Sequence, residues 1–358
     1  KMPLVPLISE LLEGTEDIND LPEKLFISTK NDQFAAVPTA SLRPVIKTLH
    51  ELYDRQDKGQ LTIQPFDAHL FDDDMVDALS EGGQIQWAGD REILKLSKKL
   101  KNFQGIEQVK QAESLTVELR DYQKIGVNWL NFLHQYKFGG ILADDMGLGK
   151  TIQTLAHLSK LKETGSLQAP ALIVVPTSLI ANWKNEAQKF TPNLTVCVFY
   201  GTERHLIENK ITQHDLVITS YASSVRDQDI HMQNHYEYII LDEAQKIKNP
   251  KTKMAQALCQ FKANHRLALS GTPIENHLGE LWSLFHFLMP GFLKNITQFR
   301  SFYQKPIEKE FDNHKQQSLN NRIKPFVLRR KKEDVLDELP AKTEIIKRTQ
   351  CSNSQAKL

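Results

Sequence analysis

The sequence has few cysteines, no long apolar run and almost no net charge, and each absence excludes a class of protein. Its three cysteines, Cys197, Cys259 and Cys351, form no CxxC pair and match no zinc-binding spacing, which indicates a reducing environment and argues against a structural metal site. No apolar stretch approaches the ~20 residues that span a bilayer, and the first residues form no basic-then-apolar leader. We therefore expect a protein without membrane partners that is not secreted, either cytoplasmic beside a bacterial nucleoid or nuclear.

Charge is balanced over the chain, with 45 lysines and arginines against 44 acidic residues and a net charge of +1. A nucleic-acid partner would therefore be held by a local patch and not by a basic surface as a whole. An apolar fraction of 40% over 358 residues is typical of a folded chain with one large or two to three ordinary domains.

Three regions can be distinguished along the chain. Residues 1–110 carry no recognisable motif and mix acidic and aliphatic stretches, so we expect an α+β accessory region of unknown role. Residues 111–280 alternate apolar strands with helices. Residues 281–358 are first aromatic and helical, then highly charged, which predicts a helical protrusion followed by a segment leading to a further lobe. The basic run at 329–332 is interpreted as a solvated face, with contact to DNA as the alternative.

The central region predicts a parallel sheet. Helical spacing of apolar residues starts at Tyr122, and further helices are expected from Lys150 and near Leu179. Short apolar strands are expected at 140–143, 171–175, 195–199, 216–219, 238–241 and 267–270. Strands that alternate with helices and are rich in Val, Ile and Leu favour an α/β fold with helices on both faces of the sheet. Ligands of such sheets bind at the carboxyl ends of the strands.

A glycine-containing loop follows the first of these strands. Residues 144–151 have the sequence DDMGLGKT. Glycines before a helix let the backbone wrap around phosphate oxygens, and the helix N-terminus adds partial positive charge. Lys150 is then placed to reach the β- and γ-phosphates of a nucleotide, and Thr151 to offer a hydroxyl to Mg²⁺. Asp144 stands where the general phosphate-loop pattern has glycine, so the loop alone also allows a simple turn.

A second motif supports ATP hydrolysis. The apolar strand at 238–241 ends in Asp242 and Glu243. We expect Asp242 to hold Mg²⁺ and Glu243 to orient and deprotonate the attacking water. Together with Lys150, these carboxylates form the predicted catalytic set, and Thr151 and Asp242 the predicted metal site.

Seven blocks in order resemble the Swi/Snf-type ATPases of helicase superfamily two, in particular DNA translocases of the bacterial type. They are 119–123 (LRDYQ), 144–151 (DDMGLGKT), 175–179 with 182–183 (VPTSL, NW), 218–221 (ITSY), 242–246 (DEAQK), 270–276 (SGTPIEN) and 326–330 (FVLRR). The resemblance implies a RecA-like first motor lobe that binds ATP and Mg²⁺, hydrolyses ATP and moves on double-stranded DNA. It also implies a remodelling activity on DNA-bound protein.

The resemblance carries roles over to individual positions. Gln123 is expected to bind the adenine edge, and the remaining nucleotide-binding positions are Arg120, Asp145, Met146, Gly147, Leu148, Gly149, Lys150 and Thr151. Residues that couple the γ-phosphate to DNA are Gln245, Ser270, Gly271 and Thr272. The DNA track is formed by Ser178, Asn182, Lys184, Thr219, Ser220 and Tyr221. Trp183 is expected in the core.

Two other functions share these motifs: an RNA helicase of the same superfamily and a catalytically silent nucleic-acid-binding module. The block at 242–246 followed by that at 270–273 matches double-strand translocases better than RNA helicases. The family's second RecA-like lobe, with its arginine finger, has no counterpart in the 358 residues. We therefore expect one half of a motor, poorly active alone.

Overall fold

The computed structural model describes residues 107–271 and 278–335, with short pieces at 22–28, 34–40, 43, 46, 56–57, 60–61, 65–70 and 96. The predictions for the rest of residues 1–110, for Thr272 and for 336–358 lie outside the described residues. Within the described part, no helix combines the length and hydropathy needed to cross a membrane.

The central region forms a seven-stranded sheet with the order β11-β5-β10-β9-β6-β8-β7, and all neighbouring strands run parallel. The strands are β5 (Gly140–Leu142), β6 (Ala171–Val175), β7 (Val196–Val198), β8 (Leu216–Ser220), β9 (His235–Asp242), β10 (Lys262–Leu269) and β11 (Val327–Leu328). The predicted parallel α/β sheet is confirmed, and every predicted strand is present, with β9 and β10 beginning three and five residues earlier than predicted.

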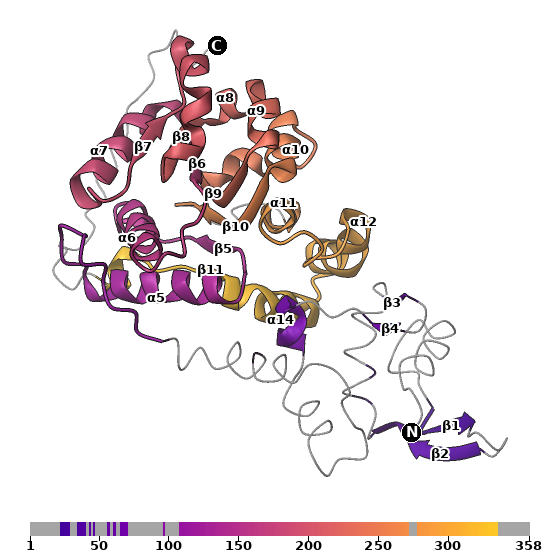
Figure 1. Ribbon diagram of the computed structural model, residues 1–358. Helices are drawn as coiled ribbons and strands as arrows, with labels where there is room; N and C mark the ends of the chain where they lie inside the picture. The colour runs from indigo at the N-terminus through magenta and orange to yellow at the C-terminus, as the bar shows by residue number, and fades with distance from the viewer. Residues whose placement is uncertain are drawn as a thin grey trace, which may run out of the picture.

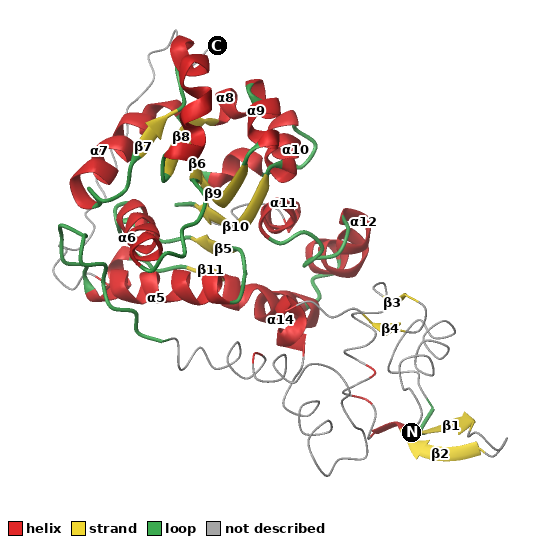
Figure 2. Cartoon of the chain, in the orientation of Figure 1, coloured by secondary structure: helices red, strands yellow, loops and turns green. Residues whose placement is uncertain are grey.

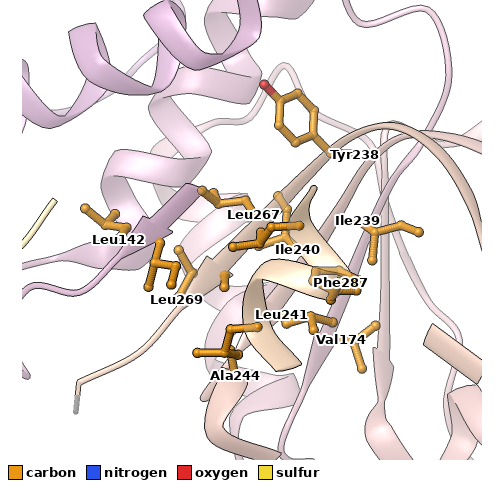
Figure 3. Close-up of a cluster of buried hydrophobic side chains, with 14 of the residues drawn as sticks. Leu142, Val174, Tyr238, Ile239, Ile240, Leu241, Ala244, Leu267, Leu269 and Phe287 are labelled. Atoms are coloured by element: carbon orange, nitrogen blue, oxygen red, sulfur yellow. The ribbon is translucent and has the colours of Figure 1, made fainter. Parts of the chain in front are cut away.

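Buried aliphatic side chains hold the sheet together. All five residues of β6 and of β8 are buried, and so are seven of the eight in β9. Figure 3 shows Leu142, Val174, Leu241 and Leu269 gathered with Phe287 in this core. Strands without an alternating polar face require cover on both sides of the sheet.

Helices provide that cover on both faces, as Figures 1 and 2 show. One side carries α6 and α7, with α5 beside α6, and the other carries α10 and α11. The bounds are α5 (Asp121–Gln135), α6 (Lys150–Glu163), α7 (Ile180–Phe190), α8 (Tyr221–Arg226), α9 (Gln228–Gln233), α10 (Lys253–Gln260) and α11 (Leu278–Leu288). Segments of 3-10 helix are η4 (Thr177–Leu179), η5 (Thr202–Gln213) and η6 (Ala244–Ile247).

After α11 the chain continues in short helices and then returns to the sheet. The helices are α12 (Ile296–Phe299), η7 (Arg300–Gln304), α13 (Lys305–Lys309), α14 (Asn313–Ile323), η8 (Lys324–Phe326) and α15 (Lys332–Val335). Phe292 packs between Phe285 and Phe326, and Trp129 of α5 donates from its indole to the Pro325 carbonyl at 3.0 Å. Strand β11, which the sequence did not predict, then pairs with β5.

The described pieces of the first 110 residues contain both strands and helical segments. Strands β1 (Lys24–Ser28) and β2 (Phe34–Pro38) pair antiparallel, as do the two-residue strands β3 (Gln56–Asp57) and β4 (Gln60–Leu61). In η3 (Pro65–Leu70), Phe66 meets Phe292 edge-on with 5.5 Å between ring centroids, which attaches this piece to the aromatic cluster.

Candidate functional site

The loop between β5 and α6 has the backbone of a phosphate-binding loop. Gly147 and Gly149 have φ of +88° and +79°, values that L-residues with a side chain rarely adopt. A Cβ on Gly149 would also lie 2.7 Å from Nε2 of Gln123 and 2.8 Å from Cγ2 of Ile152. Gly149 is the N-cap of α6, so free N–H groups of the first helical turn face the loop. Such a helix start suits an anion.

Lys150, on the first turn of α6, lies over this loop. Its ammonium group donates to the carbonyl of Asp144 at 2.7 Å and to that of Asp145 at 3.3 Å. Burial lowers the pKa of Lys150, and the charges of Asp144, Asp242 and Glu243 oppose that shift. The predicted cation and the two predicted carboxylates therefore lie within electrostatic reach of one another. Thr151 follows on the same turn, half-buried.

Asp242 ends β9 and is buried. The indole N–H of Trp183 donates to its Oδ2 at 2.8 Å, so the tryptophan predicted as core also orients the carboxylate that was predicted to be catalytic. Burial and the charge of Glu243 raise the pKa of Asp242, and the Trp183 hydrogen bond acts in the opposite direction. Carboxylate and hydroxyl oxygens are the ligands that Mg²⁺ prefers. Asp242 and Thr151 therefore fit the predicted metal site by their chemistry.

Glu243 connects the carboxylate pair to the predicted coupling residues. Its φ of +53° is unusual for a residue with a side chain, and its N–H donates to Oδ1 of Asp242 at 3.0 Å. Its Oε2 accepts from Nε2 of Gln245 at 2.7 Å, and Oε1 of Gln245 accepts from the Ser270 hydroxyl at 3.2 Å. A Cβ on Gly271 would lie 4.0 Å from Nζ of Lys150. Gln245 and Ser270 thus form a hydrogen-bonded chain from Glu243, and Gly271 follows next to the loop.

The predicted adenine-binding residue lies against the other side of the loop. Oε1 of Gln123 accepts from the N–H of Arg120 at 3.0 Å, and its Nε2 donates to the Leu148 carbonyl at 3.4 Å. Arg120 is exposed at the start of α5, and Met146 is exposed at the tip of the loop. The positions predicted from the sequence for nucleotide binding therefore surround one loop. Their roles in binding stay predictions.

The predicted DNA track divides into two groups. Ser178, Asn182 and Lys184 are exposed on η4 and α7. The other three side chains are buried, and their hydroxyl groups bond inside the domain: Thr219 to the Phe199 carbonyl, Ser220 to Ser223, and Tyr221 to the Asp242 carbonyl. This burial argues against direct phosphate contacts by the second group. Tyr221 instead supports the carboxylate loop.

A separate group of possible metal ligands lies away from these motifs. One ligand atom each of His134, Glu237 and His265 falls within 4.8 Å of the other two. His134 also bonds the Tyr238 hydroxyl at 3.1 Å, and Glu237 accepts from Asn264 at 3.0 Å. These bonds give the cluster a structural role between α5, β9 and β10.

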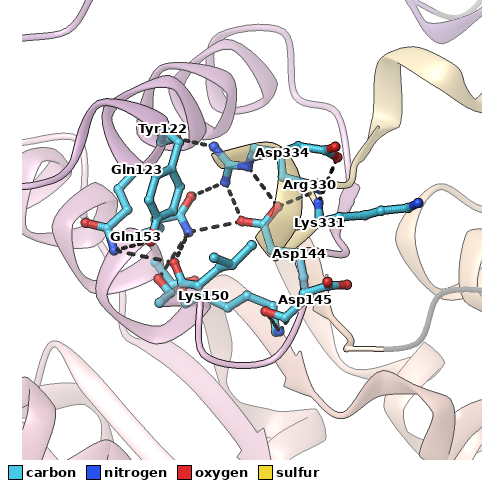
Figure 4. Close-up of polar contacts among 12 residues, drawn as sticks. Tyr122, Gln123, Asp144, Asp145, Lys150, Gln153, Arg330, Lys331 and Asp334 are labelled. Carbon is cyan, nitrogen blue, oxygen red and sulfur yellow. Dashed lines mark hydrogen bonds and ion pairs between the residues drawn. The ribbon is translucent and has the colours of Figure 1, made fainter. Parts of the chain in front are cut away.

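Arg330 packs at the back of the loop and was not predicted from the sequence as a site residue. Arg330 belongs to the basic run interpreted as a solvated face, yet only 11% of its side chain is exposed and it pairs with Asp144, which is fully buried. Figure 4 shows its guanidinium group between Tyr122, Asp144 and Gln153. The available signal was Asp144 itself, because a carboxylate at the end of a buried strand requires a partner.

Comparisons with known proteins agree with this geometry. The model of the SNF2-related domain family matches residues 122–358. YwqA of Bacillus subtilis, named as a candidate ATP-dependent helicase/translocase, is 42% identical over 299 residues, covering 82% of this chain and 31% of that protein. Human TATA-binding protein-associated factor 172 is 41% identical over 286 residues, covering 70% of this chain and 15% of that protein.

Two solved structures from Sulfolobus solfataricus share the fold. The SWI2/SNF2 ATPase core in complex with dsDNA superposes with a TM-score of 0.61 at 40% identity and covers 65% of this chain and 49% of that one. The SWI2/SNF2 ATPase core domain gives a TM-score of 0.60 at 39% identity and covers 66% of this chain and 48% of that one. The chain thus spans less than half the length of these relatives, and its sheet is RecA-like. With the family model matching most of its residues, the chain belongs to the SNF2-related domain family of Swi/Snf superfamily-two ATPases.

Proposed function

We propose that this chain is the ATP-binding and ATP-hydrolysing lobe of a double-stranded DNA translocase that remodels protein–DNA complexes. The observation that carries the proposal is the convergence of Lys150, Asp242 and Glu243 at the carboxyl ends of β5 and β9. Homology to SNF2-type ATPases supports the hydrolase class.

Each of these side chains has a distinct task in hydrolysis. Lys150 and the N–H groups at the start of α6 bind the β- and γ-phosphates. Thr151 and Asp242 hold Mg²⁺, which when bound neutralises developing charge on the phosphates. Glu243 orients a water and accepts its proton. The Gln245–Ser270 hydrogen bond would transmit a change at the carboxylates to the neighbouring segment.

Duplex DNA is the proposed track, with a DNA-bound protein as the remodelled target. The support is the Sulfolobus core described in complex with dsDNA and the relatives named as TATA-binding protein-associated factors. The exposed group Ser178, Asn182 and Lys184 would contact the DNA backbone. Such a partner also favours a location with the cell's DNA, in cytoplasm or nucleus.

A second RecA-like lobe is part of the proposal. The chain covers 31% of YwqA and 49% of the Sulfolobus core, which leaves room in those proteins for another lobe. In a two-lobed motor the γ-phosphate is also met by an arginine from the opposite lobe, and loss of such an arginine costs ~10³–10⁵ in rate. Residues 1–358 alone should therefore hydrolyse ATP slowly.

Steady-state ATP turnover with duplex DNA, with RNA and without nucleic acid tests the proposal. Residues 1–358 should show slow turnover with little stimulation, whereas the intact two-lobed protein should be strongly stimulated by duplex DNA. Stimulation by RNA alone would favour the RNA helicase. Absence of turnover under every condition would favour the silent binding module, and strong DNA stimulation of residues 1–358 would contradict the two-lobe argument.

The DNA surface has its own test. Lys184→Ala should weaken duplex binding at all sequences and reduce the slope of log affinity against log salt by about 0.9, the value for one phosphate contact. Lys253→Ala, an exposed lysine at the start of α10, is the matched control. An unchanged slope in the Lys184 variant would remove α7 from the track.

A further inference from the structure

The guanidinium group of Arg330 joins three elements that carry nucleotide-binding positions. It pairs with both carboxylate oxygens of Asp144, with an Nε–Oδ1 distance of 2.9 Å. It also donates to the Tyr122 carbonyl in α5 and, at 2.6 Å, to Oε1 of Gln153 in α6. Its carbon Cζ lies 5.4 Å from the centroid of the Tyr122 ring. The Arg330 side chain therefore makes four hydrogen bonds at the back of the loop (Figure 4), out of the five that a guanidinium group can donate.

The backbone around Arg330 follows the loop as closely as its side chain does. The N–H of Ala143 donates to the Leu328 carbonyl at 2.7 Å, and that of Asp145 to the Arg330 carbonyl at 3.0 Å. In return, the N–H of Arg330 donates to Oδ1 of Asp144 at 3.2 Å, and that of Lys332 to Oδ2 of Asp145 at 3.1 Å. The segment after β11 thus extends the β11–β5 pairing into the first residues of the loop.

Gln153 carries the same network to the other end of the loop. While its Oε1 accepts from Arg330, its Nε2 donates to the carbonyls of Leu148 and Gly149 at 3.3 and 3.1 Å. Gln153 is fully buried. A Cβ on Gly126 of α5 would lie 1.9 Å from Oε1 of Gln153, so α5 can close over this network only because position 126 is glycine.

Lys150 depends on the carbonyl groups that this network fixes. It donates to the carbonyls of Asp144 and Asp145. The carboxylates of these two residues accept from Arg330 and from the main-chain N–H of Lys332, respectively. The network also fixes the carbonyls of Leu148 and Gly149 beside Gln123. Moving the segment that carries Arg330 would therefore change both ends of the loop and the place of the phosphate-binding cation.

We propose that Arg330 is a positioning residue for the nucleotide loop, and that through it the segment after β11 and the nucleotide control each other. The inference deepens the proposed function and rests on ATP binding at residues 147–151. Arg330 does not touch the nucleotide in this scheme. It acts through Asp144 and Gln153, and a nucleotide that stabilises the loop also stabilises residues 330–332. Such coupling is reciprocal by thermodynamic necessity.

The first experiment measures binding of a non-hydrolysable ATP analogue with Mg²⁺ to residues 1–358 by titration calorimetry. R330Q should bind about tenfold more weakly than wild type, because the loop loses its bidentate partner. R330K should lose roughly three- to fivefold, since an ammonium group keeps the charge and not the fork. The neighbouring R329Q is the matched control, because Arg329 is exposed, and it should stay within about twofold of wild type.

Hydrogen exchange distinguishes coupling to the nucleotide from a purely structural role of Arg330, because a structural role predicts no change at residues 330–332 when the analogue binds. In wild type, the analogue should slow exchange of the N–H groups of Asp145, Arg330 and Lys332. In R330Q it should still protect the loop at 147–150 once bound, and no longer protect 330–332. Equal exchange at 330–332 with and without the analogue in wild type would overturn the coupling.

K150A separates failure of this inference from failure of the proposed function. If K150A loses binding while folded R330Q and R330K bind like wild type, Arg330 does not position the loop and the ATP site stands. If K150A also binds like wild type, the proposed ATP site itself is wrong. Circular dichroism establishes which variants are folded, and should R330Q not fold, wild-type affinity of R330K overturns the inference.

Discussion

The loop between β5 and α6 has two sides, which differ in how their charged groups are paired. On the side facing β9, the described residues give Lys150, Asp242 and Glu243 no ion pair, and Lys150 bonds only to main-chain carbonyls. On the side facing β11, Asp144 and Arg330 neutralise each other completely inside the protein. The difference shows which groups remain available for a charged ligand and which hold the loop in place.

The largest expected effect is on the side facing β9. Glu243→Gln keeps the shape of the side chain and removes the proposed proton acceptor, so single-turnover ATP hydrolysis measured with duplex DNA should fall ~10²–10⁴-fold. Binding of the ATP analogue should be retained. Glu208→Gln, on an exposed position of η5, is the control. Hydrolysis near the wild-type rate would place the general base at another residue.

The side facing β11 should show its largest effect in stability. Asp144→Ala leaves the Arg330 guanidinium group buried without its carboxylate, and breaking one partner of a buried pair costs about 3–5 kcal/mol of unfolding free energy. Urea denaturation measures this difference. Asp121→Ala removes the carboxylate of an exposed pair with Lys124 and should change stability little. Similar losses in the two variants would mean that burial of the Asp144 pair is unimportant.

Lys150→Ala should weaken nucleotide binding strongly and change stability little, the reverse of what is expected for Asp144→Ala. Hydrogen bonds to charged groups are worth about 1.5–3 kcal/mol each, so affinity for the ATP analogue should fall about 100-fold while stability changes little. Calorimetric titration and thermal unfolding measure the two quantities. Lys160→Ala on the same helix, whose lysine pairs with Glu163, controls for general effects on α6. If Lys150→Ala lowered stability and left the affinity for the analogue intact, Lys150 would hold the loop in place and would not bind the nucleotide.

His157, next to His134 and His265, is a buried ionisable group without an ion-pair partner among the described residues. Burial, with the charges of His134 and His265, lowers the pKa of His157 to about 3. The unfolded chain therefore binds more protons than the folded one between pH ~6.5 and ~3, and stability should fall as pH falls through that window. The slope should approach about 1.4 kcal/mol per pH unit for this group.

His157→Gln should flatten that slope, and urea denaturation between pH 7 and pH 5 measures it. His205→Gln changes an exposed histidine and should leave the slope as it is. An unchanged slope in the His157 variant would mean that this histidine carries its proton in the folded protein.

The sheet could be predicted from the sequence because parallel strands covered on both faces must be apolar along their whole length, and β6 and β8 are. The ends of β9 and β10 were placed less well, since His235 and Lys262 extend the strands with polar residues. The two-residue strand β11 has no pattern of its own, and only its pairing with β5 defines it.

The residues at 144–151 and 242–243 could be placed from the sequence because each group lies within one loop or at one strand end, and their roles in nucleotide binding stay predictions. The Arg330–Asp144 pair joins residues separated by 186 positions, and nothing in the local sequence distinguishes Arg330 from exposed Arg329. The burial of Thr219, Ser220 and Tyr221 was missed for a similar reason: a hydroxyl group at a strand end can face solvent or cap its own helix, as Ser220 does for α8. Only the packed neighbours decide.

The late return of the chain to the sheet has a consequence for biosynthesis. Val327 pairs with Ile141, so the outer edge of β5 stays open while the whole of the intervening chain is made. Open strand edges attract other strands, and distant pairings form slowly. Nascent chains of this protein should therefore be most prone to aggregation between the synthesis of β5 and that of β11. Premature termination within that interval should leave the outer edge of β5 unpaired.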